Sequence, residues 1–340
     1  MTETQLPVLT PPTSPSAKGG RARGPRLDRR HIPVLATGVL LVVMYLTGAL
    51  NYPDFADTQV LLNVFIDNSF LLVVAVGMTF VIMSGGIDLS VGAVVALTTV
   101  ITASLLRDGW PAGVVLPLVL LVGTLLGLGM GCMIHFFDVQ PFIATLAGMF
   151  LARGLAHLIN NDSISITDHF WTSVAQERLR LGDLFVSVNV VISLLVVLVA
   201  AVVLAYTRFG RNVYAVGGNK DAALLMGLPV AATRVAVYTV SGFCSALGGV
   251  LLSFYMLSGY SLHAQGMELD AIAAVVIGGT LLTGGSGYVL GTVLGVGVLG
   301  LIQTIITFQG TLSSWWTRIF IGGLLFAFIL LQRVVARRAD

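Results

Sequence analysis

Long apolar stretches follow one another along almost the whole chain, separated by short polar connections. A helix needs about 20 mostly apolar residues to cross the hydrocarbon core of a bilayer. We therefore expect an all-α, polytopic membrane helix bundle with about ten transmembrane helices. The second and eighth spans are the ones that polar residues interrupt. The ten spans cover residues 32–50, 61–83, 88–106, 113–134, 141–160, 184–206, 235–257, 267–283, 287–308 and 316–332.

The composition supports a chain that lies in a bilayer. Only 10% of the 340 residues are charged, 56% are hydrophobic, and the mean hydropathy is +0.94. That charge is too sparse for the surface of a soluble domain of this size. Cys132 and Cys244 lie inside apolar stretches, and the five histidines show no metal-ligand spacing. We therefore expect packing thiols, no disulfide and no metal site.

The basic residues predict the orientation, because cytoplasmic loops of membrane proteins are enriched in Lys and Arg. With a cytoplasmic N-terminus, 13 of the 18 Lys and Arg lie in cytoplasmic segments and only three lie in outer loops. An even number of spans then makes both termini cytoplasmic. The domain prediction is a disordered, Pro-, Ser-, Gly- and Arg-rich cytoplasmic tail, a transmembrane domain and a short cytoplasmic tail. These cover residues 1–31, 32–333 and 334–340.

A glycine-rich stretch with a carboxylate separates the second and third spans. Ser84, Gly85, Gly86 and Asp88 lie between two apolar runs in the stretch FVIMSGGIDLSVGAVV, residues 80–95. Non-helical backbone at membrane depth is tolerated where it lines a wet cavity or is buried in protein. The stretch is therefore a candidate part of a solute pathway. The alternative is a tight cytoplasmic turn in which Asp88 caps the third span.

Further polar residues fall within or at the edges of other spans. An ionised group at mid-bilayer costs roughly 2.5–3.5 kcal/mol on insertion scales, so such groups face a partner or a wet cavity. The alternatives are caps at the outer edge for the two acidic residues of the eighth span, and snorkelling or an internal ion pair for the arginine. These further candidate pathway residues are Asp67, Asn68, Thr145, Arg153, Glu268 and Asp270.

The glycine-rich stretch has a faint counterpart later in the chain. Ser84-Gly85-Gly86 with Gly92 matches Thr283-Gly284-Gly285 with Gly291, and both stretches follow one apolar span and open another. Interrupted helices at corresponding places of two halves indicate the central pathway of a transporter. Chance similarity of two Gly-rich stretches is the alternative.

The predicted cytoplasmic loop, residues 207–234, contains the signals of a short helix. Gly217 and Gly218 interrupt any preceding helix, Asn219 suits an N-cap, and Gly227 ends the helix. We expect about two turns, with an apolar face that docks into a groove of another protein. A helix on the membrane surface is the alternative. The apolar face consists of Ala222, Ala223, Leu224, Leu225 and Met226.

No motif in the chain predicts catalysis. A P-loop needs G-x-x-x-x-G-K-[ST], and neither Lys18 nor Lys220 lies in that frame. We therefore expect a transport subunit that is not an enzyme, with no cofactor of its own and no nucleic-acid partner. The alternative is an ion-coupled secondary transporter that uses Asp67, Asp88 or Glu268.

Four motifs in order resemble the membrane permeases of bacterial ribose-type sugar ABC importers, over roughly residues 35–335. They are GMTFVIMSGGIDLSVG, PFIATLAGMFLARG, RFGRNVYAVGGNKDAALLMGL and ELDAIAAVVIGGTLLTGGSGYVLGT. Within that family, the segment GTLSSWWTRIFIGGLLFAFI, residues 310–329, is most similar to a galactofuranose importer permease.

The resemblance implies a permease subunit for a monosaccharide, galactofuranose or a related sugar, in the bacterial inner membrane. It implies a periplasmic sugar-binding protein, a cytoplasmic ABC ATPase that binds ATP and Mg, and a second permease that is a paralogue or an identical copy. Residues 84–92 would be the family's signature stretch near the pathway, and residues 211–230 its coupling helix on the ATPase. The coupling-loop matches are Gly217, Asn219, Ala222, Ala223 and Gly227.

Overall fold

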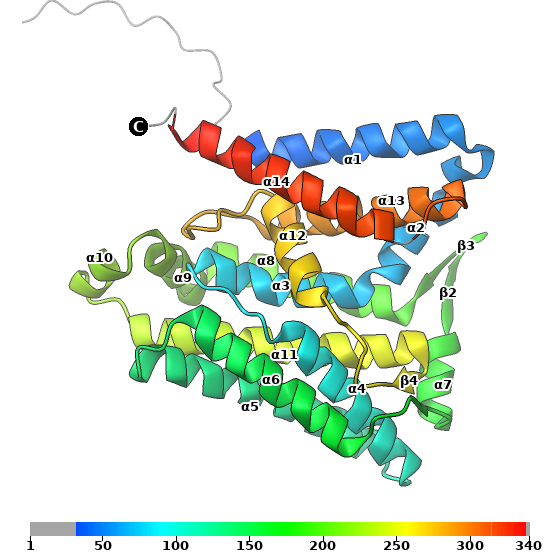
Figure 1. Cartoon of the computed structure of the whole chain (residues 1–340), viewed down its shortest axis with the longest axis horizontal. Coiled ribbons are helices and arrows are strands. Elements are labelled where there is room, and N and C mark those ends of the chain that lie inside the picture. The colour runs from blue at the N-terminus through cyan, green and yellow to red at the C-terminus, as the bar shows by residue number, and fades with distance from the viewer. Residues whose placement is uncertain (1–31, 314, 338–340) are drawn as a thin grey trace, which may run out of the picture.

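The computed structural model describes residues 32–313 and 315–337, which are mostly helical (Figure 1). The predicted N-terminal tail lies outside these residues, and the last helix extends to Arg337, into the predicted C-terminal tail. The helices are α1 (Ile32–Asn51), the 3₁₀ helix η2 (Pro53–Ala56), α2 (Thr58–Asp67), α3 (Ser69–Met83), α4 (Val91–Arg107), α5 (Ala112–Phe136), α6 (Pro141–Ile159), α7 (His169–Gln176), α8 (Val188–Tyr206), α9 (Arg208–Gly218), α10 (Lys220–Leu225), α11 (Val230–Met256), α12 (Met267–Ile277), α13 (Val289–Gln309) and α14 (Trp315–Arg337).

Seven helices of the described chain are long and apolar enough to cross a bilayer: α1, α5, α6, α8, α11, α13 and α14. An eighth candidate span is the pair α2 and α3, which is bent by 59°. The helical membrane bundle is thus confirmed, but ten full-length spans are not. The predicted span 267–283 is wrong as one helix, because α12 has only 11 residues and ends at Ile277. At 1.5 Å per residue α12 is only about 16 Å long.

The helices run between two ends of the bundle (Figure 1). At one end lie α9 and α10, together with the start of α1 and the C-terminal end of α14. At the opposite end lie α7 and the strands β2 (Arg178–Leu181) and β3 (Leu184–Ser187). We call these the α10 end and the hairpin end. The two described ends of the chain share the α10 end, while its cytoplasmic orientation stays a prediction from the basic residues.

Two small sheets depart from the all-α prediction. β2 and β3 form an antiparallel hairpin in which Leu181 pairs with Leu184, and Gly182 with φ of 68° makes the turn. The hairpin uses residues that the sequence analysis placed in the sixth span, so α8 begins only at Val188. A second antiparallel pair joins β1 (Ile164–Ser165) to β4 (Ser258–Gly259).

Small residues bring the central helices into close contact. α11 packs against α3, α4 and α5. A β-carbon added at Gly123, Gly127 or Gly131 of α5 would overlap backbone atoms of α11. The close helix approach that this glycine spacing predicts is therefore confirmed. α3 is buried along its whole length except at Phe70, as expected of a helix that is apolar on all sides.

Candidate coupling junction and transport pocket

The loop between α3 and α4 is held by the carboxylate of Asp88, which is fully buried. Asp88 Oδ1 accepts hydrogen bonds from the amide of Ser90 at 2.9 Å and from its hydroxyl at 2.6 Å. Asp88 Oδ2 accepts one from the Ser241 hydroxyl of α11 at 2.7 Å. A buried carboxylate requires such donors. Ser90, rather than Asp88, occupies the N-cap position of α4, so Asp88 fixes the loop to α11.

The rest of this loop is packed against neighbouring helices. The Thr145 hydroxyl of α6 donates to the Pro141 carbonyl at 2.8 Å and lies 3.4 Å from the Ile87 carbonyl oxygen. The Ser84 hydroxyl donates to a carbonyl of α3, and a β-carbon at Gly86 would overlap the Tyr238 hydroxyl. The structure thus brings Thr145 together with this predicted pathway segment, and protein surrounds most of the segment.

Three glycine-containing segments meet at the α10 end. The Gly285 amide donates to the Met83 carbonyl at 2.9 Å. A β-carbon at Gly217 of α9 would overlap that carbonyl oxygen and lie 2.7 Å from the Gly285 nitrogen. A β-carbon at Gly284 would lie 2.8 Å from the Gly85 nitrogen and 2.9 Å from the Gly217 oxygen. We call this contact among residues 83–86, 217–218 and 283–287 the glycine junction.

The glycine junction joins the two similar glycine-rich stretches to α9. Gly85 has φ of 81° and Gly284 has φ of 85°, a backbone region that favours glycine. The first stretch connects α3 to α4, and the second connects α12 to α13. The Tyr214 hydroxyl of α9 also donates to the Gly287 carbonyl at 2.9 Å. α9 is therefore in direct contact with both loops.

α10 is the predicted short helix, and it projects from the bundle next to α9 (Figure 1). The Asn219 side chain accepts a hydrogen bond from the Ala222 amide at 2.9 Å, so the predicted N-cap is confirmed. Gly227 follows the helix with φ of 75°. The helix has six residues, slightly fewer than predicted. Gly217 and Gly218 are the last residues of α9, a helix that the sequence analysis did not predict.

The predicted apolar face of α10 has two parts. Ala223 is fully buried and packs in a small cluster with Val216 and Val230. In contrast, Leu225 is 89% exposed and Met226 is 67% exposed. The buried part attaches α10 to its neighbours, and the exposed part is available for a partner.

Arg153 and Glu268 lie at the entry to α12. Arg153 of α6 donates to the carbonyl oxygens of Ser261 at 2.6 Å and His263 at 2.9 Å. Glu268 lies against α4, where a β-carbon on Gly92 would overlap its Oε2 atom. Arg153 thus anchors the segment that leads into α12 through backbone contacts.

Asp67 and Asn68 lie at the bend between α2 and α3. The Tyr255 hydroxyl donates to Asp67 Oδ1 at 3.1 Å, and Asn68 Nδ2 donates to the Val64 carbonyl at 2.9 Å. The candidate pathway residues therefore occupy three separate places: this bend, the α3–α4 loop with Thr145, and the entry to α12.

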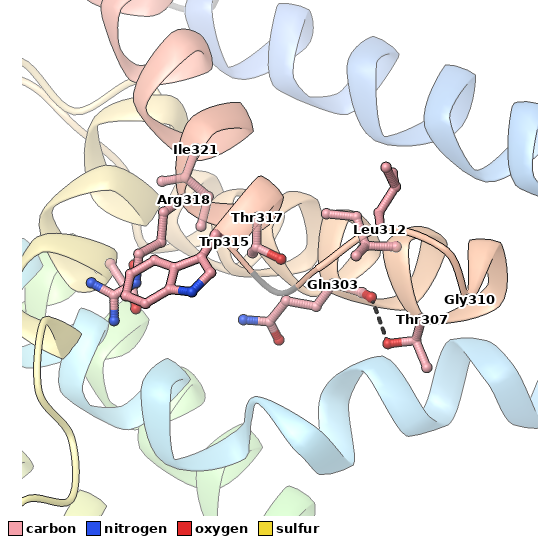
Figure 2. Close-up of a pocket in the computed structure, with 10 residues that line it drawn as sticks. Gln303, Thr307, Gly310, Leu312, Trp315, Thr317, Arg318 and Ile321 are labelled. Carbon is pink, nitrogen blue, oxygen red and sulfur yellow. Dashed lines mark hydrogen bonds between the residues drawn. The ribbon is translucent and has the colours of Figure 1, made fainter.

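A cavity of about 620 Å³ lies between α12, α13 and α14 (Figure 2). Asp270 is the one predicted pathway residue in its lining. The sequence analysis missed the other lining residues. They lie on the predicted span 287–308, which polar residues do not interrupt, in the connection after it, or near the start of the predicted span 316–332. We call this cavity the α12–α14 pocket. Its remaining lining residues are Gln303, Ile306, Thr307, Gly310, Leu312, Trp315, Thr317, Arg318 and Ile321.

Comparisons with known proteins identify the family. Residues 60–329 match the family model described as "Branched-chain amino acid transport system / permease component". The chain is 39% identical to the ribose import permease protein RbsC of Haemophilus influenzae over 290 residues, which cover 82% of this chain and 86% of that protein. This chain belongs to the ribose-type sugar ABC permease family. It is a permease component and a multi-pass membrane protein.

Two other members of the permease family align over nearly their whole length. The inner membrane ABC transporter permease protein YjfF of Escherichia coli (strain K12) is 46% identical over 307 residues, covering 90% of this chain and 93% of YjfF. The fructose import permease protein FruG of Bifidobacterium longum is 41% identical over 320 residues, covering 92% of this chain and 94% of FruG. No solved structure matches this permease.

Proposed function

We propose that this permease forms the sugar pathway of an ATP-driven importer and receives its driving force through α10. The observation that carries the proposal is the pairing of an exposed apolar tip, Leu225 and Met226, with a rigid attachment at the glycine junction. Exposed apolar side chains grouped on a short helix suit a groove on a partner protein. The junction then passes the movement to the loops before α4 and α13.

The partners in this proposal follow from the family. A separate cytoplasmic ABC ATPase binds ATP and Mg and docks on α10, a periplasmic sugar-binding protein delivers the substrate at the hairpin end, and a second permease, a paralogue or an identical copy, completes the pathway. Proteins named as ribose and fructose import permeases support the importer assignment. The name of YjfF supports the inner membrane.

The proposed substrate is a monosaccharide, with galactofuranose or a related sugar as the specific candidate. The resemblance to a galactofuranose importer permease rests on residues 310–329. This segment supplies Gly310, Leu312, Trp315 and Arg318 to the α12–α14 pocket. The segment that suggests the sugar therefore also lines this cavity.

The test measures ATPase binding and sugar import by the complete complex in proteoliposomes. It compares the wild type with the double variant Leu225→Ala, Met226→Ala. We expect the ATPase to bind at least about tenfold more weakly, because truncating two apolar interface anchors costs more than about 1.4 kcal/mol. ATP-driven sugar import should fall with it. The control is Leu50→Ala, since Leu50 is 87% exposed in the last turn of α1, and that end of α1 lies opposite α10 (Figure 1).

Two results would contradict the proposal. One is wild-type assembly and import by the double variant. The other is sugar uptake by this chain alone under an ion gradient, without an ATPase or a binding protein, which would indicate a secondary transporter instead.

A further inference from the structure

The α12–α14 pocket combines hydrogen-bonding groups of several kinds around one aromatic face. Gln303 offers an amide that both donates and accepts, while Thr307 and Thr317 offer hydroxyl groups. Trp315 is 70% exposed, so its indole is open to a ligand. In Figure 2 the Gln303 side chain lies between Trp315 and Thr307. Of these three side chains, only the Thr307 hydroxyl donates a hydrogen bond within the described part of the chain, to the backbone carbonyl of Gln303 at 2.9 Å.

The charged groups of the pocket are opposite in sign. Asp270 comes from the first turn of α12, and Arg318 comes from the first turn of α14. The Arg318 guanidinium lies 5.7 Å from the centre of a Trp315 ring, and one nitrogen lies 3.5 Å from the Gln265 carbonyl oxygen. The pocket therefore has no net formal charge, and it does not select an anionic or a cationic solute.

We propose that this pocket is a binding subsite for a neutral monosaccharide, an inference that rests on the proposed import function. A monosaccharide carries hydroxyl groups that donate and accept, and C–H faces that pack on an aromatic ring. The amide, hydroxyl, carboxylate and guanidinium groups of the pocket match the first property, and the Trp315 indole matches the second. The cavity volume of about 620 Å³ is in the range of small-molecule sites.

A zwitterionic amino acid is the competing ligand, because it could pair with both Asp270 and Arg318. It would leave the Gln303 amide and the two hydroxyls without a role, and only an aromatic or aliphatic side chain would use the indole. The pocket has more neutral hydrogen-bonding groups than charged ones, so we favour the sugar and use leucine as the contrasting probe.

The subsite can be tested by cysteine protection in the assembled importer. Thr307→Cys is placed in a chain whose Cys132 and Cys244 are replaced by alanine, and a small water-soluble thiol reagent labels it. Ribose, fructose, galactofuranose and leucine are compared at equal concentrations. A sugar at about ten times its dissociation constant should slow labelling about tenfold, since the fraction of unoccupied sites is 1/(1 + [L]/Kd). Leucine should leave the labelling rate unchanged.

Substitution of the indole separates a binding role from a structural one. Trp315→Ala should weaken sugar protection about tenfold, which corresponds to about 1.4 kcal/mol of lost aromatic contact. Trp315→Phe should restore most of the protection. Trp316→Ala is the matched control, because Trp316 is adjacent and 42% exposed but does not line the pocket.

The outcomes distinguish the two proposals. If the importer that carries Thr307→Cys transports a sugar with ATP but that sugar does not protect the cysteine, the subsite is wrong and the import function stands. Protection by leucine but not by sugars assigns the pocket to amino acids and also overturns the subsite. If the wild-type complex imports no sugar, the proposed function fails and the subsite fails with it.

Discussion

The two ends of the bundle are built in opposite ways. At the α10 end, the glycine junction brings three backbones together with no room for a β-carbon at Gly217. Near the other end of α13, the α12–α14 pocket leaves about 620 Å³ open and is lined by polar and apolar side chains. Close-packed backbone deforms little and so transmits displacement, whereas an open polar cavity can hold a solute. α13 connects the two regions, because it starts just after the junction and carries Gln303 and Thr307.

The largest effect is expected at the junction itself. Gly217→Ala forces a β-carbon onto the Met83 carbonyl oxygen, and only a backbone shift can relieve the overlap. We expect the free energy of unfolding to fall by about 3 kcal/mol, at the upper end of the usual range for overpacking. Thermal unfolding of the purified protein, followed by circular dichroism, measures this loss.

The adjacent glycine is a matched control. A β-carbon at Gly218 would meet nothing within 4 Å, so Gly218→Ala should leave the unfolding midpoint unchanged or slightly raised. Equal midpoints for the two variants would show that the α10 end is not more tightly packed than an ordinary surface.

Substitution of Asp88, which fixes the α3–α4 loop to α11, should lower the free energy of unfolding by a smaller amount. Asp88→Ala leaves the hydroxyls of Ser90 and Ser241 without their acceptor. Unsatisfied buried polar groups of this kind cost about 2 kcal/mol. Asp88→Asn should lose less, because its amide oxygen can still accept from Ser90 and its amide nitrogen can donate to Ser241. If the asparagine variant loses as much stability as the alanine variant, the negative charge rather than the hydrogen bonds holds the loop.

The smallest effect on stability is expected in the pocket. Gln303→Ala removes an exposed side chain that donates to no group in the described residues, so the unfolding free energy should change by less than about 0.5 kcal/mol. Sugar import by the complete complex should nevertheless decrease, since the amide is one of the proposed sugar contacts. A large fall in stability would mean that the pocket is part of the packed core, and the contrast between the two ends would be lost.

The sequence predicts those features that depend on local chemistry. Asn219 is an N-cap because its side-chain oxygen accepts a hydrogen bond from a free backbone N–H of the first turn. This pattern can be recognised from the sequence alone. Most spans are predicted because the length of an apolar stretch is also a local property of the sequence. The hairpin of β2 and β3 was missed because residues 184–187 are apolar enough to extend a helix, and the pairing with β2 determines their strand conformation.

The sites themselves depend on contacts between distant segments. The resemblance of Gly85 and Gly284 is visible in the sequence, but their meeting at Gly217 requires the fold. Gln303 and Thr307 were missed because two polar residues leave α13 apolar enough to be predicted as an ordinary span. Gln303 and Thr307 are four residues apart and thus share one face of the helix. That spacing is the signal that could have indicated them.

We expect α9 and α10 to act on the α12–α14 pocket through the glycine junction and α13. The direct measurement is the labelling rate of Thr307→Cys in the complete importer, with and without ATP and Mg. We expect nucleotide to change that rate in the Gly218→Ala background and to have no effect in the Gly217→Ala background, provided that both complexes assemble. An identical nucleotide response in the two backgrounds would show that the glycine junction does not couple α9 and α10 to the pocket.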